Sequence, residues 1–222
     1  MSAFFYLTYR ECKAVLESTL MAFVEQQAIS DAAHDKAHIL RVVKIAKQLC
    51  EQEQAQLDVV MAAAYLHDCV SVAKNDPRRQ QASLLAADKA IEFLSAKQLL
   101  QMQHDAIHHA IVAHSFSANV EPLTLEAKIV QDADRLDALG AIGLTRCIQV
   151  GTALGRPLYS IDDPFCETRE PDDTTYTIDH FYVKLLRLAD TMQTSSAKEE
   201  ALKRIEFMKS YLQQLSSEIE FE

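Results

Sequence analysis

The sequence is poor in the residues that make tight turns. It contains only four glycines among its 222 residues, and all four lie between residues 140 and 155. Only Pro77 and Pro122 interrupt the chain before Pro157. Because β-hairpin turns usually need residues that accept a positive φ angle, this scarcity excludes a fold rich in hairpins. The sequence therefore predicts an all-α protein.

Long apolar runs and paired cysteines are also absent. The longest uncharged apolar run, Val59–Leu66, is far shorter than the ~20 residues that a bilayer-spanning helix needs. No basic residue precedes the apolar residues Phe4–Leu7, so no secretory signal is predicted. The five cysteines are an odd number and form no CxxC pair, which favours reduced thiols over a disulfide framework. We therefore expect a cytoplasmic protein without a membrane segment.

Positive charge is scarce as well. The formal net charge is −10 and the isoelectric point is about 5.3, which opposes binding to a nucleic acid polymer or an anionic membrane surface. A small-molecule phosphate ester or a nucleotide remains a compatible partner. No P-loop or GxGxxG string is present, so the phosphates would not be held by a glycine-rich turn. The sequence is compatible with a monomer or a homodimer.

Apolar residues recur at helical spacing along most of the chain. Each stripe predicts one face of an amphipathic helix, and together they predict about seven to nine helices and no sheet. The last helix is expected at about residues 197–217. The other stripes are Val42, Ile45, Ala46 and Leu49; Leu57, Val60, Met61 and Ala64; Leu84, Ala87, Ile91 and Leu94; Ile129, Ala133, Leu136, Gly140 and Gly143; and Phe181, Leu185, Leu188 and Met192.

One segment breaks the helical pattern. Residues 151–179 contain three prolines, two glycines and two pairs of adjacent aspartates. Loops of this length in compact domains are usually functional or disordered. We therefore predict a long irregular loop near 151–179 that lies over a pocket, with a flexible excursion as the alternative.

A histidine and an aspartate end the least polar segment of the chain. His67 and Asp68 directly follow Ala62–Leu66, and His67 continues the apolar face of this predicted helix. Burying an unpaired carboxylate costs several kcal/mol, so Asp68 needs a partner. A metal ion can bind both side chains. His38 lies four residues before Val42 on the stripe of the preceding helix and is also predicted to point inward.

Three aspartates follow in the stripe at residues 129–143. Asp132 and Asp134 lie two residues apart, so on a helix they point about 200° from each other and cannot both face one site. Asp134 and Asp137 share a face. Periodicity alone does not decide which carboxylate faces a site, and an acidic edge exposed to solvent is the alternative interpretation.

Four more histidines lie between residues 104 and 114. His114 follows Ile107 and Ile111 at helical spacing, which predicts that it points inward with a substrate-binding or supporting role. His104 and His108 are four residues apart and could hold an ion on one helix face. An exposed polar face explains this pair equally well.

These residues resemble the ordered H, HD, D signature of the HD-domain metal-dependent phosphohydrolases. The corresponding positions are His38, the pair His67–Asp68, and Asp134 within the string ADRL. Longer strings are similar to the YedJ/YpgQ-like branch of this family: HDKAHILRVVKIA (34–46), AAAYLHD (62–68), AHSFSA (113–118), IVQDADRLDALGAIGLTR (129–146) and DHFYVKLLRLADTMQT (179–194). The resemblance implies a single HD-type domain over residues 1–222, with a metal-site core at about 30–150, the loop at 151–179 and C-terminal helices at about 180–217.

The resemblance also implies a chemistry. One divalent metal ion, which could be manganese, magnesium, nickel, iron or zinc, would be bound by His38, His67, Asp68 and Asp134. A metal-activated water would attack phosphorus in a small phosphorylated metabolite, with nucleotides as the first candidates. Conversion of a nucleoside triphosphate to the monophosphate and pyrophosphate is one such reaction. His67 and Asp68 would be catalytic, and Asp137 could assist as a base.

Basic residues near these strings are candidates for binding the substrate's phosphates, although ordinary loop charges or internal ion pairs explain them too. The candidates are Lys74, Arg78, Arg135 and Lys184, with His114 as a further substrate-binding residue. Two other functions remain compatible with the sequence. One is a metal-stabilised ligand-binding or regulatory module without turnover. The other is a di-iron HD-type oxygenase, in which His109 and His114 would serve a second iron.

Overall fold

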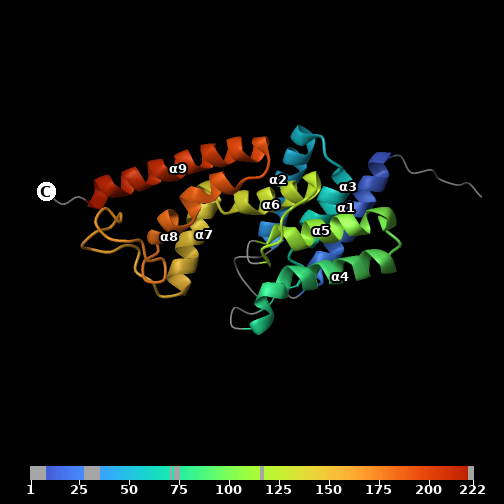
Figure 1. The fold of residues 1–222 in the computed structure, drawn as a ribbon, viewed down its shortest axis with the longest axis horizontal. Coiled ribbons are helices and arrows are strands. Elements are labelled where there is room, and N and C mark those ends of the chain that lie inside the picture. The colour runs from blue at the N-terminus through green and yellow to red at the C-terminus, as the bar shows by residue number, and fades with distance from the viewer. Residues whose placement is uncertain (1–8, 28–35, 71, 73–75, 116–117, 220–222) are drawn as a thin grey trace, which may run out of the picture. The chain divides into compact units, whose positions relative to one another are not determined.

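The structure, a computed structural model, describes residues 9–27, 36–70, 72, 76–115 and 118–219. These residues form nine α-helices and no strand, so the all-α prediction is confirmed (Figure 1). None of these helices is long and apolar enough to cross a bilayer. The chain divides into two compact units, Met1–Gln131 and Asp132–Glu222. The single HD-type domain stays a prediction.

The first unit surrounds a helix that is buried on all sides. Every residue of α3 from Val59 to Leu66 is buried, and this helix contacts α1, α2 and α5. A helix that is apolar all round is stable only when other helices cover it. The helices of this unit are α1 (Tyr9–Glu25), α2 (Lys36–Glu53), α3 (Leu57–Leu66), α4 (Ala82–Ala96), α5 (His104–His114), α6 (Leu125–Asp137) up to Gln131, and the 3₁₀ helices η1 (Pro77–Gln81) and η2 (Gln101–Gln103).

The second unit is organised by the long C-terminal helix. α9 (Ser195–Ile219) covers the predicted 197–217 and contacts α7 and η4. Its buried stripe is Ala197, Ala201, Ile205, Met208 and Leu212. The unit also contains the end of α6, α7 (Gly140–Ala153), α8 (Asp179–Val183) and the 3₁₀ helix η4 (Leu185–Thr191).

The stripe at residues 129–143 forms two helices, so the prediction of one helix was wrong. α6 ends at Asp137 and α7 begins at Gly140, with Leu139 extended between them at φ −119° and ψ 167°. Gly140 has a φ of +68°, a left-handed conformation that favours glycine. The glycines of the stripe therefore mark a helix corner and not a continuous packing face.

Gly143→Ala is expected to lower the free energy of unfolding by about 1–3 kcal/mol or more, as overpacking does. A Cβ atom at Gly143 would lie 2.1 Å from the carbonyl oxygen of Ala138, so the backbone of the corner would have to move. Urea unfolding followed by circular dichroism measures the loss. The control is Gly155→Ala, where a Cβ would meet nothing within 4 Å and only the strain of a +69° φ remains. A smaller loss at Gly143 than at Gly155 would contradict the close contact.

The stripe from Phe181 to Met192 also differs from the prediction. α8 ends at Val183, and Lys184 leaves the helical region at φ −133° and ψ −59°. The chain continues as the 3₁₀ helix η4, so this stripe is not one α-helix. Leu185 and Leu188 are nevertheless buried, because the spacing of three also suits a 3₁₀ turn.

The segment between α7 and α8 is irregular, as predicted, and is held by its own hydrogen bonds. The carboxylate of Asp163 accepts hydrogen bonds from the backbone N–H groups of Thr168, Glu167 and Arg169 at 2.8, 2.9 and 3.1 Å. These bonds hold the pKa of the Asp163 carboxyl well below its usual range. Asp172 organises the next turn in the same way. The loop is therefore internally ordered, and its position over a pocket stays a prediction.

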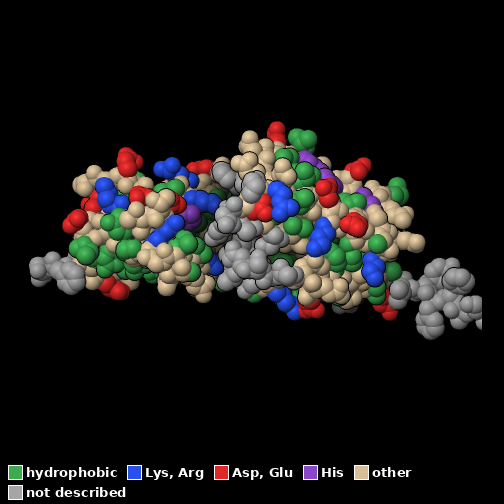
Figure 2. Space-filling model, turned by 90° about the horizontal axis from the view of Figure 1, so that it is seen from below, with side chains coloured by type: hydrophobic (Ala, Val, Ile, Leu, Met, Phe, Trp, Pro, Cys, Tyr) green, Lys and Arg blue, Asp and Glu red, His purple; other side chains and the backbone are tan. Residues whose placement is uncertain are grey.

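Charged side chains of both signs are mixed on the surface. Figure 2 shows Lys and Arg side chains interspersed with Asp and Glu over the face that it draws. A nucleic acid interface needs basic residues gathered in a patch or stripe. The described residues on this face show no such stripe, and the expectation that no nucleic acid polymer binds stays a prediction.

Candidate metal centre

The end of α3 places the HD pair. The α-helix stops at Leu66, and His67 and Asp68 form the turn that follows, closed by a 3.1 Å hydrogen bond from the Cys69 N–H to the Leu66 carbonyl. His67 is fully buried, whereas the Asp68 side chain is 23% exposed. Both side chains therefore lie at the end of the apolar helix, with His67 in the core and Asp68 at its edge.

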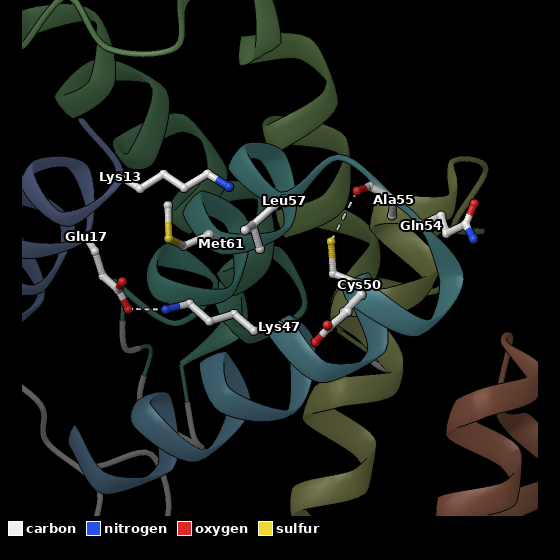
Figure 3. Close-up of a pocket in the computed structure, with 9 residues that line it drawn as sticks. Lys13, Glu17, Lys47, Cys50, Gln54, Ala55, Leu57 and Met61 are labelled. Carbon is white, nitrogen blue, oxygen red and sulfur yellow. Dashed lines mark hydrogen bonds and ion pairs between the residues drawn. The ribbon is translucent and has the colours of Figure 1, made fainter. Parts of the chain in front are cut away.

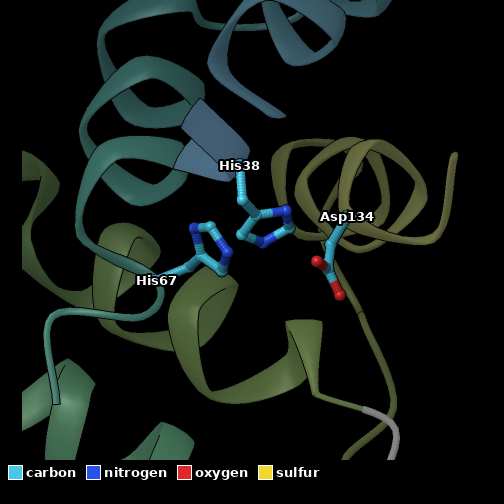
Figure 4. A group of neighbouring side chains, drawn as sticks. All are labelled: His38, His67 and Asp134. Carbon is cyan, nitrogen blue, oxygen red and sulfur yellow. The ribbon is translucent and has the colours of Figure 1, made fainter. Parts of the chain in front are cut away.

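A second histidine comes from α2. His38 is buried, and its ring centroid lies 5.5 Å from that of His67 in an edge-to-face arrangement. Figure 4 shows the two imidazoles pointing toward one another from their separate helices. Asp134, also labelled there, is carried by α6 and belongs to the second unit.

A hydrogen bond determines which ring nitrogen of His67 can bind a metal ion. Its Nδ1 lies 2.8 Å from the carbonyl oxygen of Ala64, and a carbonyl only accepts, so Nδ1 carries the proton. Nε2 of the neutral ring is then the atom with a lone pair. Metal-binding histidines commonly have this arrangement, in which a backbone carbonyl orients the ring.

The carboxylate of Asp68 faces the imidazole nitrogens. Its Oδ2 lies 3.5 Å from Nε2 of His67 and 3.8 Å from Nε2 of His38. Ligand atoms about 2.1 Å from a shared ion lie about 3.0–3.4 Å apart at octahedral or tetrahedral angles. The observed separations exceed these values only slightly, so this set of nitrogen and oxygen donors fits a divalent ion.

His114 joins the same cluster. It is buried, as predicted from its helical spacing, and its Nε2 lies 3.6 Å from Oδ1 of Asp68. Its ring centroid is 4.9 Å from that of His67. The structure thus brings together four predicted site residues of the first unit.

The neighbouring histidines of α5 lie elsewhere. Nε2 of His109 accepts a 3.0 Å hydrogen bond from the Leu123 N–H, and Nε2 of His108 lies 3.0 Å from a carboxylate oxygen of Asp88. No metal-binding group formed by the described residues includes either histidine. Nothing in this arrangement favours the di-iron alternative, which needed His109.

The aspartates of α6 have different surroundings. Asp132 is fully buried, and its carboxylate accepts hydrogen bonds from the backbone N–H groups of Gln193 and Thr194 at 2.9 and 2.8 Å. Burial nonetheless raises the pKa of the Asp132 carboxyl. Asp137 is also buried and forms a 2.7 Å ion pair with Arg146. Both carboxylates therefore have partners within the second unit.

The basic candidates are spread along the chain. Arg78 is exposed and paired with Asp76 at 2.8 Å, and its hydrogen bonds lower the pKa of the Asp76 carboxyl to about 2. Lys184 is exposed, and Lys74 lies outside the described residues. Arg135 is partly buried and donates a hydrogen bond to the Thr191 carbonyl, while its Nε is buried without a hydrogen-bond partner.

A separate cavity of about 470 Å³ lies at the other ends of α2 and α3. Figure 3 shows its lining, in which the Cys50 thiol donates a 3.3 Å hydrogen bond to the Ala55 carbonyl. Burial raises the pKa of this thiol, which suits an unreactive cysteine. The lining contains no predicted site residue: it is Lys13, Glu17, Lys47, Cys50, Glu51, Gln54, Ala55, Leu57 and Met61.

Comparison with known proteins identifies the family. A family model for the HD domain matches residues 36–139. YpgQ of Bacillus subtilis (strain 168) is 36% identical over 192 residues, which is 85% of either chain. The chain belongs to the HD-domain family. The resemblance inferred from the sequence is therefore confirmed.

Solved structures share the fold of this HD-domain protein. The crystal structure of Bacillus subtilis YpgQ in complex with ADP superimposes with a TM-score of 0.67 at 32% identity, covering 92% of this chain and 93% of the other. An HD-superfamily hydrolase from Bacillus thuringiensis gives 0.73 at 34% identity, covering 93% and 97%. The chain is thus an enzyme of the HD superfamily of metal-dependent phosphohydrolases, as predicted. HD domains bind divalent metals, and the His–Asp cluster could hold one.

Proposed function

We propose that this enzyme hydrolyses nucleotides with one divalent ion bound by His38, His67, Asp68 and Asp134. The observation that carries the proposal is the approach of the His38 and His67 Nε2 atoms to the Asp68 carboxylate. The position of Asp134 in the family string supports it as the fourth ligand. The hydrogen bonds that occupy Asp132 support the same choice. The complex of YpgQ with ADP supports a nucleotide as the substrate.

The exposure of the cluster indicates where a substrate would enter. The side chain of Asp68 is 23% exposed, whereas those of His38, His67 and His114 are 1%, 0% and 6% exposed. The open side of the cluster therefore lies at Asp68. A bound divalent ion supplies a Lewis acid for phosphoryl oxygens and a polarised water. Asp68 would then orient this water by hydrogen bonding, and His67 would keep Asp68 in place.

Among the basic residues, Arg135 is the one that we propose most directly as a contact for the substrate's phosphates. Its buried Nε donor costs free energy until an acceptor reaches it, and a phosphate oxygen is a suitable acceptor. Lys74, Arg78 and Lys184 are proposed as further phosphate contacts. For Asp137, the pair with Arg146 supports an indirect role, in which it positions the end of α6.

The wild-type enzyme is expected to release pyrophosphate from nucleoside triphosphates in the presence of manganese, nickel or magnesium, and to lose this activity in chelator. The measurement is the release of phosphate and pyrophosphate from a panel of nucleoside mono-, di- and triphosphates. Product chromatography identifies the bond that is cleaved. Phosphate release from monophosphates alone would contradict the expected release of pyrophosphate and would indicate a nucleotidase. Absence of release from every nucleotide, with one ion bound per chain, would contradict the nucleotide proposal.

A further inference from the structure

The cluster contains one more imidazole than the H, HD, D signature requires. Oδ2 of Asp68 faces His38 and His67, whereas its other oxygen, Oδ1, faces His114 at 3.6 Å. The carboxylate therefore presents each of its oxygens to at least one imidazole nitrogen. His67, Asp68 and His114 each offer a ligand atom, and these three atoms lie within 4.8 Å of one another.

The ring of His114 is oriented in the same way as that of His67. Its Nδ1 lies 2.6 Å from the carbonyl oxygen of Ile111, three residues earlier, just as Nδ1 of His67 lies 2.8 Å from Ala64. Since a carbonyl only accepts, Nδ1 of His114 carries the proton and Nε2 has the lone pair. Two acceptor atoms that face each other, such as this nitrogen and Oδ1 of Asp68, are bridged favourably by a cation.

The backbone beside His114 is held by a buried amide. Gln131 is 3% exposed, and its Nε2 donates a 2.7 Å hydrogen bond to the carbonyl oxygen of Ala113. This bond fixes the last turn of α5, on which His114 lies. A ligand that is fixed before the ion binds loses little conformational entropy on binding.

We propose that His114 is a direct ligand of the divalent ion that His67 and Asp68 bind. This inference rests on the metal centre of the proposed function and replaces the substrate-binding role expected for His114. A third imidazole shifts the preference of a site toward nickel, zinc or iron and away from magnesium, which prefers oxygen ligands. The enzyme should therefore bind nickel far more tightly than magnesium.

The test is calorimetric titration of the full-length protein with nickel chloride. His114→Ala is expected to weaken nickel binding at least ~100-fold, because the loss of a residue that only orients a metal ligand already weakens binding by up to about 100-fold. The matched control is His109→Ala on the same helix, which removes an imidazole that bonds to the Leu123 N–H and should bind nickel like the wild type. Unchanged affinity in His114→Ala would overturn the proposal.

A second measurement separates ligation from a structural effect. Pulsed electron paramagnetic resonance of the manganese-loaded protein counts the coordinated imidazole nitrogens, and the count should fall by one in His114→Ala or in the bulkier His114→Gln. Circular dichroism verifies that each variant folds. An unchanged count in a folded variant would overturn the proposal. If the wild type binds neither nickel nor manganese, the metal centre of the proposed function fails. If Asp68→Ala loses the ion but His114→Ala keeps it, only the proposed role of His114 fails.

Discussion

Asp68→Asn is expected to lower kcat/KM for the cleaved nucleotide at least about a thousand-fold while the protein keeps its helices. Asparagine has almost the same size as aspartate but lacks the charge that complements a divalent ion. The Nε2 atoms of His38, His67 and His114 all lie 3.5 to 3.8 Å from this one carboxylate. Its loss therefore affects every member of the cluster in the first unit.

The measurement pairs steady-state kinetics with thermal unfolding, each with and without manganese. Saturating metal at a hundred times its Kd should raise the stability of the wild type by about 2.7 kcal/mol, and the variant should lose this gain. The control is Asp88→Asn, which removes an equal charge from an exposed site on α4. With a purely structural metal, Asp68→Asn would lose the same gain in stability, but the wild type would turn over no phosphate ester.

The local part of the site was predictable because it depends on one helix. The run Val59–Leu66 is apolar on every side, so it had to be buried, and the polar pair after it was predicted at the end of a helix that is otherwise core. The spacing of His38 before Val42 and of His114 after Ile111 likewise predicted that both rings point inward. The structure confirms these three placements.

The choice between Asp132 and Asp134 could not be made from periodicity. The partners that occupy Asp132 are backbone N–H groups 61 and 62 residues later in the sequence, just before α9. A pattern of side chains carries no information about such distant backbone donors. The helix corner at residues 138–140 was missed for a related reason. Small residues fit either a close packing face or a turn, and only the φ of Gly140 distinguishes these two roles.

Arg169→Ala is expected to lower the free energy of unfolding by about 3 kcal/mol or more, because it leaves a buried charge without its partner. Asp179, at the start of α8, is fully buried, and its carboxylate accepts hydrogen bonds from the Arg169 guanidinium and from the Asp172 N–H. Urea unfolding at pH 7 measures the loss. The control is Lys203→Ala, which breaks an ion pair between two exposed side chains of α9 and should leave the midpoint unchanged.

The dependence of this loss on pH tests its electrostatic origin. Burial by itself raises the pKa of the Asp179 carboxyl, but the hydrogen bonds from Arg169 and Asp172 hold it below its usual value of 3.8. A lowered folded-state pKa stabilises the protein above about pH 4, and this contribution disappears as the pH falls through the folded-state value. In Arg169→Ala burial still acts, opposed by the weaker hydrogen bonds from the Asp172 N–H and the Cys166 thiol, so the carboxyl takes up its proton at a higher pH. The stability difference between wild type and variant should therefore shrink on acidification, and a constant difference between pH 7 and pH 3 would contradict the charge-pair explanation.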